Sequence, residues 1–428
     1  TKAERLGEKR HELVVRPAFD GRRGDADLER LGVGPDHFVA PGTWLYTHLQ
    51  RHAPVHGRQR HRRCRRRVVT GHVRHGSCRL QTHGARRQAP ARLHAGNLPR
   101  TLWSMAEHRE VADRRAWFEH VCREVHAHYA GLDEGEPASY IPELATVDPD
   151  RFAIAAMTQD GASVVVGDGG HLFTIQSISK LLVYGLALEI HGRERVLERV
   201  GVAPTGDSFN AIELDEATDR APNPMVNAGA IAVTDLIGGS SVEERLDVMS
   251  AMYERYLGRR PELDAAVWAS ERATGNRNRA IAYLMLSAGI VGPDVEQTLD
   301  VYFAQCSVLV NVQDLATIAA TVANYGVHPV TGEQVVPREV TRDMLTVALT
   351  CGMYDYAGEW AYSVGIPAKS GVGGGILGML PGAGGLATYS PRLDAIGNSV
   401  RGLRVFEELS AEFELHLFDP DRPWRRGP

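Results

Sequence analysis

Lysine is almost missing from this 428-residue chain, although positive charge is not. Against 44 arginines there are only four lysines, at Lys2, Lys9, Lys180 and Lys369. Arginine stays charged at any accessible pH, whereas a buried lysine can lose its proton and act as a base. The two lysines in the organised part of the chain, Lys180 and Lys369, are therefore candidates for a role that arginine cannot fill.

Cysteines and long apolar runs are also scarce. The five cysteines are widely spaced, with no C-x-x-C pair, which argues against a disulfide framework or a zinc site. No stretch reaches the roughly 18 consecutive apolar residues of a membrane-spanning helix, and the first residues lack the zones of a signal peptide. We therefore expect a cytoplasmic protein without metal or cofactor. Because the sequence starts at Thr1, a cleaved leader stays an alternative.

Acidic residues are absent between His37 and Ala106, where residues 51–100 alone carry 14 arginines and 7 histidines. Residues 1–104 have a formal charge of +14, and residues 105–428 one of −19. An acidic folded part is a poor candidate for binding a phosphate backbone. We therefore expect no nucleic-acid partner for residues 105–428.

Three interpretations of residues 1–104 stay open. The segment lacks sustained periodicity, which favours disorder. Its arginine clusters would suit a basic arm for nucleic acid. Its Arg/His/Pro/Gly/Ala bias is also what GC-rich DNA gives when it is read upstream of the true start, and Met105 opens a well-patterned helix. We predict a boundary at Met105, with residues 1–104 disordered or a mis-assigned gene start and residues 105–428 the catalytic domain.

The hydrophobic pattern of residues 105–428 predicts an α/β fold. Residues 105–131 predict an amphipathic helix, and residues 151–176 a hairpin around the turn sequence QDG. Most segments between residues 177 and 350 have helical periodicity, residues 373–391 predict a second hairpin, and residues 399–418 a terminal helix. Strands from both ends thus bracket a helical lobe of about residues 190–350 in one compact unit.

Both organised-region lysines belong to short motifs. Lys180 ends the sequence SISK, which begins at Ser177, and Lys369 opens KSG. These match the S-x-x-K and K-[ST]-G elements of serine-lysine acyl-transfer enzymes. On a helix, positions three apart share a face, so the Lys180 amine can approach the Ser177 hydroxyl. We predict that Ser177 is a nucleophile at the start of a helix, that Lys180 is its base, and that KSG forms an edge strand beside them.

A plain helix start would also explain a lone S-x-x-K, but lysine scarcity and the second motif favour catalysis. Beyond these two motifs, several segments across about residues 107–418 resemble the serine-dependent glutaminases, in the order of that family: SYIPELATVDP, IQSISK, NPMVNAGAI, ERATGNRNRAIAYLM, YFAQCS, LTCGMYDYAGEWAYSVGIPAKSGVGGGI and YSPRLDAIGNSVRG. The resemblance implies a fold like the serine β-lactamases and penicillin-binding proteins, with a mainly antiparallel sheet flanked by helices. It also implies hydrolysis of L-glutamine to L-glutamate and ammonia through a γ-glutamyl ester, by a homodimer or homotetramer.

Residue by residue, the resemblance implies Ser177 as nucleophile and Lys180 as base, with the backbone N–H groups of Ser177 and Val372 as oxyanion hole. Tyr354 is implied to assist proton transfer to the leaving ammonia. The implied substrate-binding residues are Ser177, Tyr354 and Val372 together with Tyr140, Asn227, Glu271, Asn278 and Tyr302. A carboxylate suits the free α-ammonium, and neutral amides and hydroxyls suit the α-carboxylate. Taken singly, each of these residues would also fit a core, turn or cap position.

Two other functions share part of this evidence. A penicillin-recognising hydrolase or carboxypeptidase would also contain S-x-x-K and K-S-G, but such enzymes act outside the cell. A non-enzymatic protein could bind nucleic acid through its arginine-rich start, and that binding would depend on salt and vanish without residues 1–104.

Overall fold

The computed structural model describes residues 111–206, 210–212 and 214–420. All of them fall in one compact unit. The expectations for residues 1–104 lie outside the described residues, so the boundary at Met105 stays a prediction.

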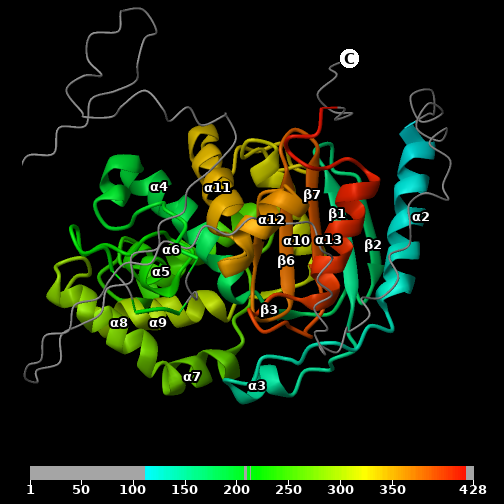
Figure 1. Ribbon diagram of the computed structural model, residues 1–428. Coiled ribbons are helices and arrows are strands. Elements are labelled where there is room, and N and C mark those ends of the chain that lie inside the picture. Colours follow the sequence, from blue (N-terminus) through cyan, green and yellow to red (C-terminus); the bar gives the residue numbers. More distant parts are fainter. Residues whose placement is uncertain (1–110, 207–209, 213, 421–428) are drawn as a thin grey trace, which may run out of the picture. The chain divides into compact units, whose positions relative to one another are not determined.

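Five antiparallel strands form the main sheet, in the order β2-β1-β7-β6-β5 (Figure 1). Their bounds are β1 Ala153–Thr158, β2 Ser163–Gly167, β5 Ala368–Ser370, β6 Gly375–Leu380 and β7 Gly384–Tyr389. A separate two-stranded sheet pairs β3 Phe173–Thr174 with β4 Leu309–Val310. In the main sheet, β1 pairs with β7 from Ala153 opposite Tyr389 to Thr158 opposite Gly384. Strands from both ends of the described chain therefore lie side by side in one sheet.

Both predicted hairpins form, as the pairs β1–β2 and β6–β7. Gly161 in the first turn has a φ of +85°, a left-handed conformation that glycine adopts without steric cost. The short strand β5, which carries Lys369 and Ser370 of the KSG sequence, is an edge strand as predicted.

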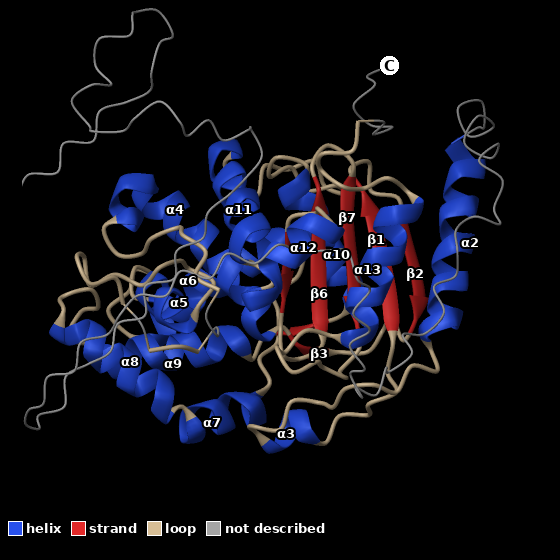
Figure 2. Cartoon of the chain, in the orientation of Figure 1, coloured by secondary structure: helices blue, strands red, loops and turns tan. Residues whose placement is uncertain are grey.

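Helices make up most of the other residues that the structure describes (Figure 2). Their bounds are α2 Val111–Tyr129, α3 Pro142–Ala145, α4 Ser179–Leu197, α5 Asn227–Thr234, α6 Val242–Leu257, α7 Ala265–Thr274, α8 Asn276–Ser287, α9 Val295–Cys306, α10 Val312–Ala323, α11 Arg338–Cys351, α12 Ala357–Ser363 and α13 Val400–Glu412, with short 3₁₀ turns η3 Gln176–Ile178 and η4 Tyr354–Tyr356. Gly192 lies within the bounds of α4, but its φ of 74° interrupts the helical geometry at that point.

Two layers of helices enclose the sheet. Helix α10 packs against β1, β6 and β7, whereas α2, α12 and α13 contribute to a hydrophobic core on the opposite face (Figure 1). A Cβ at Gly385 in β7 would lie 2.4 Å from the Ala316 carbonyl oxygen of α10. The glycine therefore lets the helix backbone approach the sheet more closely than any larger residue would.

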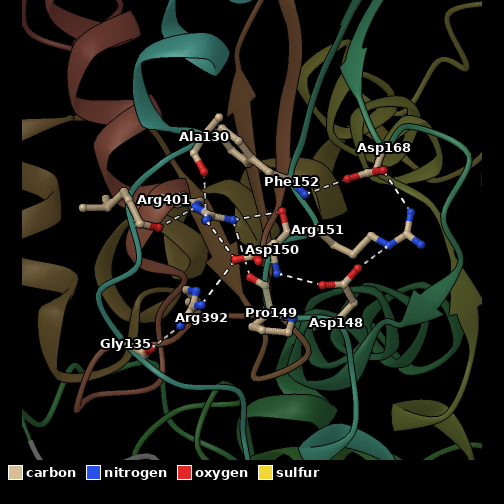
Figure 3. A network of polar contacts seen from close by, with 11 residues as sticks. Ala130, Gly135, Asp148, Pro149, Asp150, Arg151, Phe152, Asp168, Arg392 and Arg401 are labelled. Carbon is tan, nitrogen blue, oxygen red and sulfur yellow. Dashed lines mark hydrogen bonds and ion pairs between the residues drawn. The ribbon is translucent and has the colours of Figure 1, made fainter.

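Arg401 joins the last helix to the segment that precedes β1 (Figure 3). Its side chain is buried, and its guanidinium donates to the carbonyl oxygens of Leu132 at 2.8 Å, Ala130 at 3.0 Å and Asp150 at 3.1 Å. The Asp150 carboxylate lies 3.7 Å from Arg401 and 3.3 Å from Arg392. Three carbonyl groups thus depend on one buried side chain.

We expect Arg401→Met to lower the free energy of unfolding by about 3–5 kcal/mol, because buried carbonyl oxygens lose their donors. Urea denaturation followed by circular dichroism measures this. Arg404→Met is the matched control on the same helix, since Arg404 is partly exposed and pairs with Glu407 at the surface. We expect its effect to stay below about 1 kcal/mol. Similar losses in both variants would contradict the assigned role of Arg401.

Candidate active site

Ser177 lies in the 3₁₀ turn η3, immediately before α4. Helix α4 thus begins two residues after the predicted nucleophile and not at it, while Lys180 occupies its first turn. Both side chains are buried, with 8% of Ser177 and 1% of Lys180 exposed. The preceding residue, Gln176, has a left-handed φ of 50°. A non-glycine residue adopts this conformation at an energetic cost, which is a common feature of functional sites.

The amine of Lys180 is held by two oxygen acceptors. Its Nζ donates to the Asn227 side-chain oxygen at 2.7 Å and to the Met225 carbonyl oxygen at 3.2 Å. Burial lowers the pKa of Lys180 to about 8, although electrostatic interactions with Cys306 and Glu271 act to raise it. The amine can therefore lose its proton near neutral pH, which a general base requires.

Tyr354 is the third predicted catalytic side chain near Ser177. It opens η4 with a left-handed φ of 56°, and its hydroxyl donates to the Ser370 carbonyl oxygen at 3.1 Å. Burial raises the pKa of Tyr354 to about 12, although hydrogen bonds to Ser177 and Ser370 lower it. The hydroxyl is therefore neutral and lies within hydrogen-bond reach of the predicted nucleophile.

Lys369 packs against the ring of Tyr354. Its Nζ donates to the carbonyl oxygens of Ser370 at 2.6 Å and Gly352 at 3.0 Å, and lies 4.1 Å from the centre of the Tyr354 ring. Burial, with a further contribution from the charge of Lys180, holds the pKa of Lys369 well below its usual value. Lys369 and Tyr354 thus donate to the same Ser370 carbonyl oxygen, and the Lys369 amine lies over the Tyr354 ring, so Lys369 helps to position Tyr354.

The strand that carries KSG continues into a glycine-rich turn beside η3. A Cβ at Gly371 would lie 2.9 Å from the Ile175 carbonyl oxygen, and one at Gly373 would lie 2.6 Å from that of Thr174. Glycine at these positions therefore allows the two backbones to approach closely. Val372 lies between them and is partly buried, so its backbone passes close to the segment that precedes the predicted nucleophile.

A second group of predicted residues gathers around Glu271 on α7. This carboxylate is 6% exposed and accepts a hydrogen bond from the Tyr140 hydroxyl at 2.7 Å. Burial raises the pKa of Glu271, while hydrogen bonds to Tyr140 and Gln176 and the charge of Lys180 lower it. Tyr302 on α9 is buried, and burial together with nearby Cys306 and Glu271 raises its pKa well above the usual value.

The two groups are connected through side chains. The Asn227 amide that accepts from Lys180 also donates to the Asn278 side-chain oxygen at 2.9 Å. Val372 packs against a small apolar cluster that includes Ile141, the neighbour of Tyr140, and Val267 of α7. The structure therefore gathers every predicted site residue around one region, between η3, the starts of α5 and α8, and the turn after β5.

Sequence reasoning missed two residues of this region. The Gln176 side-chain oxygen accepts a hydrogen bond from the Tyr140 hydroxyl at 3.2 Å, and the Gln176 side chain is also hydrogen-bonded to Glu271. In the sequence, only the position of Gln176 directly before Ser177 indicated that it belongs to the site. Cys306 lies close enough to Lys180 and Glu271 to interact with both, and burial raises the pKa of its thiol to about 12. A thiol with that pKa stays neutral and packs as a small apolar group.

The known proteins that this chain is similar to are glutaminases. The family model described as Glutaminase matches residues 135–418. The glutaminase of Nostoc sp. is 57% identical over 299 residues, covering 70% of this chain and 90% of the relative. Glutaminase 2 of Clostridium perfringens is 46% identical over 290 residues, covering 67% and 95%.

Solved structures give the same result. The structure of Mglu in its glutamate form is 43% identical and has a TM-score of 0.68, covering 71% of this chain and 70% of that one. The probable glutaminase from Bacillus subtilis complexed with 6-diazo-5-oxo-L-norleucine is 34% identical, with a TM-score of 0.65 and coverage of 72% and 98%.

Proposed function

Because this chain belongs to the glutaminase family and has its β-lactamase-like fold, we propose that it hydrolyses the side-chain amide of L-glutamine to L-glutamate and ammonia. The observation that carries this proposal is the buried Lys180 amine, whose pKa is about 8, three residues after the buried Ser177. An amine of this kind can remove the serine proton at a pH where an exposed lysine could not.

In the proposed reaction, Lys180 takes the proton of Ser177 while the serine oxygen attacks the amide carbon. The backbone N–H groups of Ser177 and Val372 stabilise the oxyanion. Tyr354 gives its proton to the departing nitrogen and is reprotonated by Lys180, so ammonia leaves, a γ-glutamyl ester remains on Ser177 and the Lys180 amine is neutral again. A water molecule then attacks the ester with Lys180 as base, which releases glutamate and restores the serine. The neutral Tyr354 hydroxyl within reach of Ser177 supports the proton transfer.

The residues around Glu271 are proposed to bind the amino-acid end. An ionised Glu271 would pair with the α-ammonium, and the amides of Asn227 and Asn278 with the hydroxyls of Tyr140 and Tyr302 would bind the α-carboxylate. Support comes from the burial of Glu271, because a carboxylate with little water around it gains more from an incoming cation.

An ammonia-release assay on purified protein with glutamine, asparagine and the β-lactam nitrocefin tests the proposal. We expect ammonia from glutamine and no turnover of nitrocefin. Turnover of nitrocefin without ammonia release would instead support a penicillin-recognising hydrolase.

The pH dependence tests the base directly. Only the neutral amine of Lys180 can accept the serine proton, so kcat/KM should increase as pH rises through about 8 and then level off. The profile is measured from initial rates between about pH 6 and 9.5 at low glutamine. A rate that falls with rising pH across this range would exclude a neutral Lys180 as the active form.

We also propose a cytoplasmic homodimer or homotetramer whose catalytic domain begins at Met105. Among the helices of the described residues, none is long and apolar enough to cross a membrane. Light scattering during gel filtration would give the oligomeric state. A version that starts at Met105 should keep the ammonia-release rate of the full chain, and loss of activity would contradict the boundary.

A further inference from the structure

The turn that precedes α5 holds the amine of Lys180. The Met225 carbonyl oxygen accepts from the Lys180 Nζ at 3.2 Å, and Asn227, the first residue of α5, accepts from it at 2.7 Å. A neutral amine has two hydrogens and one lone pair in a tetrahedral arrangement. When two acceptors engage both hydrogens, the lone pair has one direction, and in the proposed reaction the Ser177 hydroxyl must lie in that direction.

The peptide unit that carries the Met225 carbonyl is held from its other side by Asn223. This side chain is 2% exposed, and its Oδ1 accepts from the N–H groups of Val226 at 3.3 Å and Met225 at 3.0 Å. The Val226 N–H and the Met225 carbonyl belong to one planar peptide unit and point in opposite directions. Asn223 and Lys180 therefore bond to opposite sides of the same peptide unit.

Asn223 itself has little freedom to move. Pro222 and Pro224 flank it, and a proline fixes its own φ and restricts the residue before it. The Asn223 Nδ2 donates to the Ala203 carbonyl oxygen at 2.9 Å. A Cβ at Gly229 would lie 1.9 Å from the Asn223 carbonyl oxygen, so the backbone of α5 packs directly against this turn. A rigidly held side chain can thus fix the orientation of the peptide unit that it bonds.

We propose that Asn223 is a positioning residue for the general base, and that it acts by orienting the peptide unit whose carbonyl accepts from Lys180. With that carbonyl in place, one hydrogen of the amine is held and the lone pair can face Ser177. The inference rests on the proposed function and deepens it, because it takes Lys180 as the base. Asn223 acts through the Met225 carbonyl, so its loss should slow proton transfer more than it weakens the binding of glutamine.

Asn223→Ala is the first test. We expect kcat for glutamine to fall about tenfold to a hundredfold, because a misplaced base transfers protons less efficiently. KM should stay within about threefold, since Asn227 keeps its hydrogen bond to Asn278. Initial rates of ammonia release give both constants, and circular dichroism confirms folding. An unchanged kcat would overturn the proposal, whereas no ammonia release from the wild-type protein would contradict the proposed function instead.

Asn324→Ala is the matched control. Asn324 also holds a turn, directly after α10, where its side-chain amide donates to the Val327 carbonyl oxygen at 3.1 Å. Its loss removes a hydrogen bond of the same kind from a turn that does not hold Lys180. We expect kcat to stay within about threefold of the wild type. Equal falls in kcat for the two variants would contradict a specific role of Asn223.

A double-variant cycle separates positioning from a general structural role. Lys180→Met has no amine to orient, so adding Asn223→Ala should lower its residual kcat by less than about threefold. Ammonia release at high enzyme concentration measures this residual rate. A further fall as large as the one in the wild-type background would overturn the proposal, because Asn223 would then act independently of Lys180.

Asn223→Asp provides a second, independent measurement. It keeps an acceptor oxygen for the two backbone N–H groups, so kcat should exceed that of Asn223→Ala. The introduced carboxylate favours the protonated lysine, so the rise of kcat/KM should shift to higher pH. Lys180 also interacts electrostatically with Glu271 on α7, Cys306 on α9 and Lys369 on β5, which both variants leave unchanged. If Asn223→Ala does not fold, an unshifted pH profile in Asn223→Asp would overturn the proposal.

Discussion

Ser177→Ala is expected to lower kcat for glutamine hydrolysis by a factor on the order of 10⁶, the size of loss that follows removal of a serine nucleophile acting as a unit with its base. Without the hydroxyl no γ-glutamyl ester can form. Alanine fits the buried 3₁₀ turn without added volume, so the fold should persist. Initial rates of ammonia release, with circular dichroism to confirm folding, measure the effect.

Ser179→Ala is the matched control for this variant. Ser179 is also buried, lies two residues further along, and donates its hydroxyl to the Gln176 carbonyl oxygen at 2.7 Å. Its loss should reduce activity by less than about tenfold, the worth of one neutral hydrogen bond. If Ser177→Ala kept measurable turnover and Ser179→Ala did not, the nucleophile would be assigned to the wrong serine.

Lys180→Arg is expected to reduce kcat by about 10²–10⁴, the usual contribution of general base catalysis. Arginine keeps its positive charge and can still donate to Asn227 and Met225, but it cannot accept the proton of Ser177 at any accessible pH. The substitution therefore separates the proton-accepting role of Lys180 from its charge and its hydrogen bonds.

Three measurements make this variant decisive. The residual activity of Lys180→Arg should no longer rise through pH 8, and Lys180→Met should show a loss of similar size. The KM for glutamine should change less than kcat, because Lys180 is not proposed to contact the amino-acid end. Near wild-type turnover in Lys180→Arg would show that the lysine acts only through its charge.

Local patterns in the sequence were enough to predict much of the framework. Two apolar runs around a QDG turn predicted the first hairpin and a glycine-rich turn the second, and both form. The three-residue spacing of Ser177 and Lys180 brought them to the start of one helix, with an error of two residues in where that helix begins. Such features follow from short-range geometry, which a sequence expresses directly.

The roles of the binding residues needed the family resemblance, because no local pattern links them. Tyr140 and Glu271 are 131 residues apart, yet their side chains are hydrogen-bonded. The left-handed conformations of Gln176 and Tyr354 are equally invisible in the sequence, since neither residue is a type that favours positive φ. Tertiary contacts impose both features.

The sequence by itself therefore determined the residue types that the chemistry requires and the short-range spacing of Ser177 and Lys180, since these depend on side-chain chemistry and helical periodicity alone. Only the tertiary structure decided that β1 pairs with β7 and that the Lys369 amine lies over the Tyr354 ring. Those features arise where segments far apart in the chain pack together, and the burial created there also lowers the pKa of Lys180.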